Sequence, residues 1–326
     1  MAERLVGQLS LADGLVSVPA NAMLDEVKVL VDWQAVSEVL GRRDSPGPGA
    51  PTYPAPVLFR CLLLGVWHGL SDPALEAAVA DRISFRRFAG LSLDDKTPDH
   101  TTLWRFREEL EKHGLIDRLF DEIARQLDAK GMIVRRGTLV DASLIQAAAR
   151  PPKKPRGADG GKPKPSADAD ARWGRRGKRT VFGYNLHIGV DQEHTLIRRM
   201  VLTDASVGDT ERADDLICGD EKAVYGDKIY STKARHRRLR AARIKDRLMR
   251  RPNKHHPELP PREKKRNRLI AKVRFAVERP FAVFKERYGL RRMRFFSLAR
   301  NRVAMLLAAS AYNLRRAIGV PAAAPG

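Results

Sequence analysis

Cysteine is almost absent from this chain, whose 326 residues include only Cys61 and Cys218. Such scarcity excludes a disulfide scaffold and a cysteine-rich zinc module. Long apolar runs are also lacking: the longest, 57–70, is interrupted by charged and polar side chains and is too short to cross a bilayer. The first residues carry Glu3 and Arg4 where a signal peptide has an apolar segment. We therefore expect a reduced, cytoplasmic protein without a membrane partner.

Acidic residues are scarce in the second half of the chain. Residues 1–140 carry 17 basic and 20 acidic side chains, whereas residues 141–326 carry 44 basic and 19 acidic ones. The second half therefore carries a net charge of +25 and the first half −3, which together give the formal charge of +22. Such a basic second half predicts a polyanionic partner, and in the cytoplasm that partner is nucleic acid. Apolar residues make up 43 % of the chain, enough for a core, and the length suggests about two domains.

Helical spacing of apolar residues dominates residues 1–131. It is found over 24–40, 57–69 and 115–130, the last ended by Gly131. Two further helices are expected to start at Ser71-Asp72-Pro73 and at Thr97-Pro98, because proline is tolerated in the first turn. The second of these would turn Leu103, Phe106 and Leu110 inward. The sequence thus predicts an all-helical N-terminal domain, 1–131.

The pattern changes at residue 132, where short apolar strands begin to alternate with helices. Strands are predicted at 138–141, 184–190, 196–202, 223–227 and 246–250, and helices at 209–218, 231–241, 260–285 and 297–318. A segment rich in Pro, Gly, Lys and Arg, at about 147–180, is predicted to be a disordered basic loop. The fold class is therefore α+β: a helical domain, then an α/β domain with a mixed sheet over 132–320 and a flexible tail, 321–326.

Three acidic residues are candidates for chemistry. Asp141 and Asp227 each end an apolar strand, and carboxylates that meet at one sheet edge suit a divalent cation such as Mg²⁺. Arg274, Glu278 and Lys285 follow i, i+4, i+11 spacing, which puts them on one helix face over about 16 Å. A strand-end Asp is also common in turns, and Arg274–Glu278 could be an ordinary surface pair. Among the histidines no zinc spacing is found, and His187 is at most a neighbour of the site.

Several motifs give the chain a resemblance to a known family. They are Pro98-Asp99-His100-Thr101-Thr102-Leu103-Trp104-Arg105-Phe106-Arg107, Val140-Asp141-Ala142-Ser143, Gly183-Tyr184-Asn185-Leu186-His187, 202–209, Tyr225-Gly226-Asp227-Lys228-Ile229-Tyr230, and Arg274-x3-Glu278-x6-Lys285 followed by Tyr288-Gly289-Leu290-Arg291-Arg292. With these motifs the chain resembles the DDE transposases of bacterial insertion sequences, of the IS-four/IS-five superfamily, over nearly its whole length. The resemblance implies a ribonuclease-H-like catalytic core. Ala271 stands where the family signature has Tyr, and Pro280 predicts that a new helix starts near Glu278.

The resemblance also implies roles for individual residues. Asp141, Asp227 and Glu278 would be the catalytic triad and the ligands of two Mg²⁺ or Mn²⁺ ions. Seven basic residues would contact DNA: Arg274, Lys285, Lys228, Arg291, Arg292, Arg105 and Arg107. Arg105 and Arg107 lie on the helix predicted to start at Thr97. This helix either recognises the DNA ends or is a core helix of the domain.

Transposition is therefore the expected function: binding of the inverted repeats of an insertion sequence, cleavage at its ends, and strand transfer into target DNA. The protein would act on double-stranded DNA at the nucleoid, as a homodimer or a higher multimer, because two ends must be handled together. Two alternatives stay open. One is a nuclease of the same fold without strand transfer; the other is a catalytically inactive DNA-binding relic.

Overall fold

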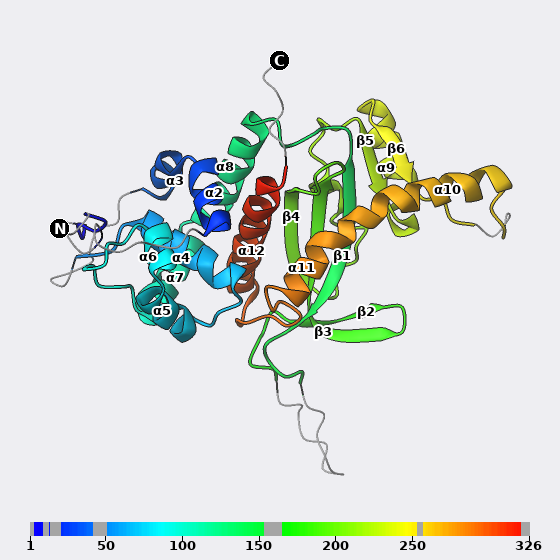
Figure 1. The fold of residues 1–326 in the computed structure, drawn as a ribbon. Helices are drawn as coiled ribbons and strands as arrows, with labels where there is room; N and C mark the ends of the chain where they lie inside the picture. Colours follow the sequence, from blue (N-terminus) through cyan, green and yellow to red (C-terminus); the bar gives the residue numbers. More distant parts are fainter. Residues whose placement is uncertain are drawn as a thin grey trace, which may run out of the picture. The chain divides into compact units, whose positions relative to one another are not determined.

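The computed structural model describes residues 3–8, 13, 21–41, 51–152, 165–252 and 257–320. The chain forms two compact units, Met1–Met132 with Val303–Gly326, and Ile133–Arg302. Figure 1 shows the ribbon of the chain with its helices and strands labelled. Part of the predicted basic loop, 153–164, and the predicted tail, 321–326, lie outside the described residues. Within the described residues, no helix combines the length and the apolar composition that a membrane crossing requires.

The first unit is helical, as predicted. Its elements are α2 (Ala22–Leu30), α3 (Trp33–Leu40), α4 (Ala55–Trp67), α5 (Asp72–Asp81), α6 (Ile83–Ala89), α7 (His100–Lys112), α8 (Leu115–Ala129) and, from Val303 onward, α12 (Leu298–Ile318).

Capping side chains set several of the helix boundaries. The predicted helix over 24–40 is two helices, because Val31 is extended and the Asp32 carboxylate accepts from the first amides of α3. Helix α7 starts later than Thr97-Pro98 suggested, since Asp99 accepts from Thr102 N at 2.6 Å. Ser71 caps α5 as expected.

Helix α4 forms the centre of the first unit. Nearly all of its side chains are buried, including Phe59 and Leu62. Trp67 Nε1 donates to the carbonyl of Ala311 on α12 at 2.8 Å. Burial of this apolar helix needs a partner surface, and the alanine-rich end of α12 supplies part of it. Residues from 303 onward, which the sequence analysis assigned to the second domain, therefore pack in the first unit.

A six-stranded mixed sheet organises the second unit. Its strands are β1 (Thr138–Gln146), β2 (Arg172–Arg176), β3 (Arg179–Asp191), β4 (Ile197–Asp204), β5 (Ala223–Gly226) and β6 (Lys245–Leu248). They are ordered β2-β3-β1-β5-β6, and β4 also pairs with β3. Strand β1 is antiparallel to β3 and parallel to β5, which is parallel to β6. This arrangement confirms the predicted fold class and is consistent with the implied ribonuclease-H-like core.

Two predictions in this unit were wrong in detail. Residues 172–176 form β2, so the segment predicted as a disordered loop contains a strand, because Trp173 pairs with Phe182 of β3 and their rings lie 5.5 Å apart. The helix predicted over 209–218 is only a 3-10 turn, Ala213–Leu216 (η1). The predicted hairpin is confirmed as β3 and β4.

Helices cover both faces of the sheet. Helix α9 (Lys233–Ala241) and η1 pack against Val140 through Leu239 and Leu216. On the other face lies α10 (Pro261–Arg274), followed by the 3-10 turn Phe275–Val277 (η3) and α11 (Glu278–Glu286) (Figure 1). Because neighbouring residues of a strand point to opposite faces, Val140 belongs to the apolar layer while the next residue points toward α10.

We expect the stability of the fold to decline at mildly acidic pH because of His187. The ring is fully buried, and its Nε2 lies 3.1 Å from Thr203 Oγ1. That hydroxyl donates to the carbonyl of Asp204, so Nε2 carries the proton, while Nδ1 has no hydrogen-bond partner among the described residues. Burial lowers the pKa of His187 to about 4, so the folded protein keeps the ring neutral where the unfolded chain is protonated.

Above about pH 6.5 the ring is neutral in both states, and its burial costs no stability. As the pH falls toward 4, only the unfolded chain gains the proton, so the free energy of unfolding decreases by on the order of 3 kcal/mol. Urea unfolding at pH 7.5 and at pH 4.5 measures it. His187→Gln should lose clearly less stability between the two pH values than the unchanged protein does. Equal losses would contradict the assignment.

Candidate active site

Asp141 is a buried carboxylate between two arginines. It is 1 % exposed; its Oδ2 accepts from Arg274 Nη2 at 2.9 Å, and its Oδ1 lies 3.3 Å from Arg176 Nη2. Burial raises the pKa of Asp141 and nearby Glu278 adds to the rise, whereas the two arginines oppose it. The sequence put Asp141 at a strand end, but β1 continues to Gln146 because the long β3 pairs with it throughout.

Strand β5 runs parallel to β1 and ends at Gly226, one residue before the position opposite Asp141. Thr138 pairs with Val224 and Leu139 with Tyr225, so extending this register by two residues puts Asp227 level with Asp141. Asp227 keeps an extended backbone, and its carboxylate accepts from Ile229 N at 2.7 Å as the cap of a short 3-10 turn. The expected meeting of the two aspartates at one sheet edge therefore agrees with the strand register.

Glu278 begins a new helix, as Pro280 predicted. Helix α10 ends at Arg274, and α11 starts at Glu278 with the proline in its first turn, where a missing amide hydrogen costs little. Despite the break, the two flanking cations reach the same face of β1. Arg274 contacts Asp141, and Lys285 Nζ donates to Ser143 Oγ at 2.6 Å. Burial, with Arg179 nearby, lowers the pKa of Lys285.

Asp141, Glu278 and Lys285 line an open pocket of about 390 Å³. Its polar lining consists of Asp141, Ser143, Arg176, Arg179, Glu278 and Lys285. The structure thus brings Asp141, Glu278, Arg274 and Lys285 together, and the register brings Asp227 to the same edge. A pocket that combines carboxylates with cations can hold metal ions and phosphates side by side.

Sequence reasoning missed three residues of this region. Arg176 was assigned to a loop. The one sequence hint of a hairpin there was Gly177, which in the structure has a φ of +61° in the turn between β2 and β3. Ser143 was quoted only within a motif. Asp209 lies 4.0 Å from Arg176 and accepts from Asn185 Nδ2 at 2.8 Å, and it carried no signal beyond its place in the stretch 202–209.

Two family models match this chain. One, described as a transposase domain (DUF772), matches residues 15–109; the other, described as a transposase DDE domain, matches residues 132–314, which is more than half of the chain. The chain belongs to the DDE transposases. No solved structure matches it. Membership of this family implies DNA as the substrate and divalent metal ions as cofactors, and it confirms the resemblance drawn from the motifs.

The transposase pocket has the donor chemistry that such ions require. Asp141 and Glu278 line it, and the strand register puts Asp227 level with Asp141. All three candidate ligands offer only carboxylate oxygens, the donors preferred by hard cations such as Mg²⁺ and Mn²⁺. No histidine or cysteine lines the pocket among the described residues. The residues present therefore fit hard divalent cations such as Mg²⁺ and Mn²⁺ better than zinc, which favours histidine and cysteine ligands.

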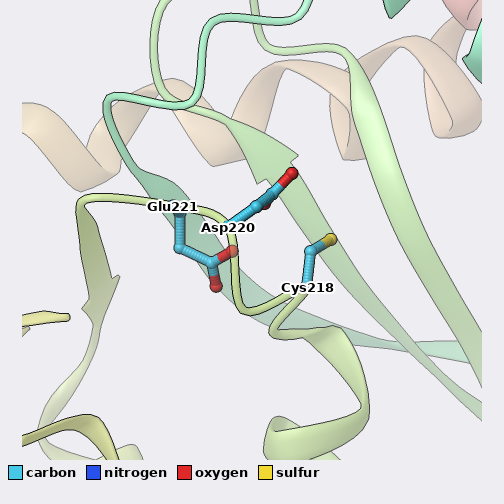
Figure 2. A group of neighbouring side chains, drawn as sticks. All are labelled: Cys218, Asp220 and Glu221. Carbon is cyan, nitrogen blue, oxygen red and sulfur yellow. The ribbon is translucent and has the colours of Figure 1, made fainter. Parts of the chain in front are cut away.

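A second acidic group lies elsewhere in the same unit. Cys218, Asp220 and Glu221 have ligand atoms within 4.8 Å of one another (Figure 2). Arg198 Nη2 donates to both oxygens of Asp220 at 2.6 and 2.7 Å, and Arg135 donates at 2.7 Å. Although burial opposes it, these bonds lower the pKa of Asp220 to about 2. Two guanidinium groups hold Asp220, and the cluster contains none of the motif carboxylates Asp141, Asp227 and Glu278, so we do not count it among the metal ligands.

The remaining candidate DNA contacts divide into two groups. Lys228, Arg105 and Arg291 are exposed, the last paired with Glu286. Arg292 is exposed as well, but it donates to the carbonyls of Ala147 and Ala148 and anchors the segment that follows β1.

Arg107 is also engaged inside its own unit. Its side chain is 15 % exposed and donates twice to the carboxylate of Asp72, at 2.6 and 2.7 Å, which joins α7 to α5. Arg292 and Arg107 are therefore structural in this arrangement, and the other candidates are better placed for a phosphate.

Arg105 and Arg107 form a matched pair for a test. Arg107→Ala should lower the free energy of unfolding by about 2 kcal/mol, because it removes both hydrogen bonds that the guanidinium donates to the Asp72 carboxylate. Arg105→Ala should leave stability unchanged and, if α7 contacts DNA, weaken DNA binding. Urea unfolding and DNA titration measure the two effects. An Arg107→Ala protein of normal stability but weakened DNA binding would reverse the assignment.

Proposed function

We propose that this transposase binds the terminal inverted repeats of an insertion sequence and catalyses metal-dependent cleavage and strand transfer at the element ends. One observation carries the proposal. Asp141 and Glu278 line the same pocket as Arg176, Arg179 and Lys285, and the β1–β5 register supports adding Asp227 to them. The carboxylates of such a pocket can bind a metal ion, and its cations can bind a phosphodiester.

In this proposal Asp141, Asp227 and Glu278 hold two Mg²⁺ or Mn²⁺ ions. Metal bound there supplies Lewis-acid activation of the attacking oxygen and of the leaving oxygen. Asp141 suits the role of fixed ligand, because it lies on the central strand and its orientation is held by the bond from Arg274. Glu278 is exposed at the first residue of α11, so its carboxylate can adjust to an ion without distorting the sheet.

Arg274 and Lys285 are proposed as contacts to the scissile strand. Both hold polar groups of β1 now, and both come from the helical segment that crosses the pocket. Lys285 has three donor hydrogens, of which the Ser143 contact uses one, so a phosphate oxygen can be bound beside it. Lys228 and Arg291 would add salt-dependent affinity for the DNA backbone without specifying sequence.

The chemistry consists of two displacements at phosphorus. In cleavage, the oxygen of water forms a bond to phosphorus while the bond to the 3′ oxygen breaks; that oxygen takes a proton and becomes a 3′-OH at the element end. In strand transfer, this 3′-OH attacks a target phosphate, and the target's own 3′ oxygen leaves. Neither step needs a covalent protein–DNA intermediate, so no protein nucleophile is required. Because two ends must be joined together, we propose a homodimer or a higher multimer on DNA.

Variants of the proposed ligands test this function. Asp227→Asn and Glu278→Gln should reduce cleavage of a plasmid carrying the element ends by about a thousandfold or more, the loss of several kcal/mol of transition-state stabilisation. DNA binding in EDTA should remain, because no phosphate contact is removed. Glu258→Gln serves as the control, since its exposed carboxylate pairs with Lys264 outside the pocket. Nicked, excised and joined DNA are the products to measure.

The products separate the proposed function from its alternatives. Metal-dependent cleavage with joining, lost in both variants but not in the control, supports the transposase. Cleavage without joining indicates a nuclease of the same fold. Binding of the ends without cleavage in any metal, and without a difference between the variants, would leave a DNA-binding relic.

A further inference from the structure

Arg176 is the last residue of β2 and is followed by the tight turn at Gly177. Its Nη2 lies 3.3 Å from Asp141 Oδ1 and 4.0 Å from Asp209 Oδ2, and its Nη1 donates to the carbonyl of Ala142. A side chain from the end of a hairpin therefore neutralises the central carboxylate of the active site.

The two arginines that hold Asp141 differ in how firmly they are fixed. Arg274 ends a fourteen-residue helix, is 17 % exposed and lies 2.9 Å from Oδ2. Arg176 is 42 % exposed, lies farther from its oxygen, and belongs to a five-residue strand that pairs only with β3 among the described strands. Of the two cations, Arg176 is thus the one that can leave Asp141 without disturbing the packing of a helix on the sheet.

Arg176 also lies between two pockets. The active-site pocket of about 390 Å³ holds Asp141 and Glu278, and a second pocket of about 350 Å³ is lined by Asp209 and Trp173. Arg176 lines both. A rotation of its side chain would therefore expose Oδ1 of Asp141 while the guanidinium stays at the rim of the site. Asp209 would keep its bond from Asn185 during this movement.

We infer that Arg176 is a positioning residue with two successive partners: Asp141 before metal loading, and a phosphate of the DNA afterwards. The inference rests on the proposed function. A divalent cation and a guanidinium repel each other and compete for the same carboxylate oxygen, so binding of the ion drives Arg176 from Asp141. The released guanidinium presents a planar set of donors that matches a phosphate, at the edge of the pocket where the scissile strand would lie.

Metal binding without DNA tests the first half of the inference. Arg176→Gln keeps an amide near the carbonyl of Ala142 but removes the charge, so the dissociation constant for Mn²⁺, measured by electron paramagnetic resonance, should fall about tenfold. Arg175→Gln is the matched control, because Arg175 neighbours Arg176 on the same strand, is exposed, and donates to Gly177 O at 3.0 Å. It should leave the Mn²⁺ dissociation constant unchanged.

Arg176→Lys provides the second variant. It keeps the positive charge, so its Mn²⁺ affinity should stay close to that of the unchanged protein, and it remains informative if Arg176→Gln fails to fold. If Arg176 has only a structural role, Arg176→Gln will bind Mn²⁺ with an unchanged or a higher dissociation constant. That result would overturn the inference.

DNA binding tests the second half. Addition of Mn²⁺ should increase the affinity of the unchanged protein for a DNA end, and Arg176→Gln should lose most of this increase while it binds DNA normally in EDTA. Equal increases in both proteins would contradict the phosphate role. Both readouts are independent of cleavage. If the metal and DNA effects are found but no DNA is cut, the proposed function fails and the role of Arg176 stands.

Discussion

The contact between Arg274 and Asp141 is the interaction on which the candidate active-site side of the sheet depends. It joins the helix that covers the sheet to the central strand, and it compensates a carboxylate that is almost fully removed from water. An ionised carboxylate in such a place is costly unless it is paired. Arg274 is also the last residue of α10, four residues before Glu278 begins α11, so the same helical segment presents both side chains.

The rest of the site follows from the alternation of side chains along β1. Val140 joins the apolar layer under α9, whereas Asp141 and Ser143 face the helical segment that supplies Arg274 and Lys285. A shift by one residue would bury the carboxylate among apolar side chains and expose the valine. The short β5 matters equally, since its end at Gly226 leaves room for a second carboxylate beside the first.

The sequence predicted what depends on local pattern. The helical first unit, the β3–β4 hairpin and the new helix at Glu278 each have a clear local cause, in apolar spacing, alternation or a proline. What depends on distant partners was not predictable. Trp173 becomes part of a strand because β2 pairs with β3 along its whole length. Residues of α12 from 303 onward belong to the first unit because their apolar side chains are buried there, with the Ala311 carbonyl bonded to Trp67 of α4. Arg176 was missed for the same reason, since its partners lie on other strands and loops.

The central claim is that the cation-rimmed pocket at Asp141, and not the arginine-neutralised cluster at Cys218, is the metal centre of this transposase. Anomalous X-ray scattering from crystals of the protein soaked in Mn²⁺ tests it most directly. We predict peaks beside the carboxylates of Asp141, Asp227 and Glu278, with Arg176 turned away from Asp141. A peak only beside Cys218, Asp220 and Glu221, with none at Asp141, would contradict this assignment.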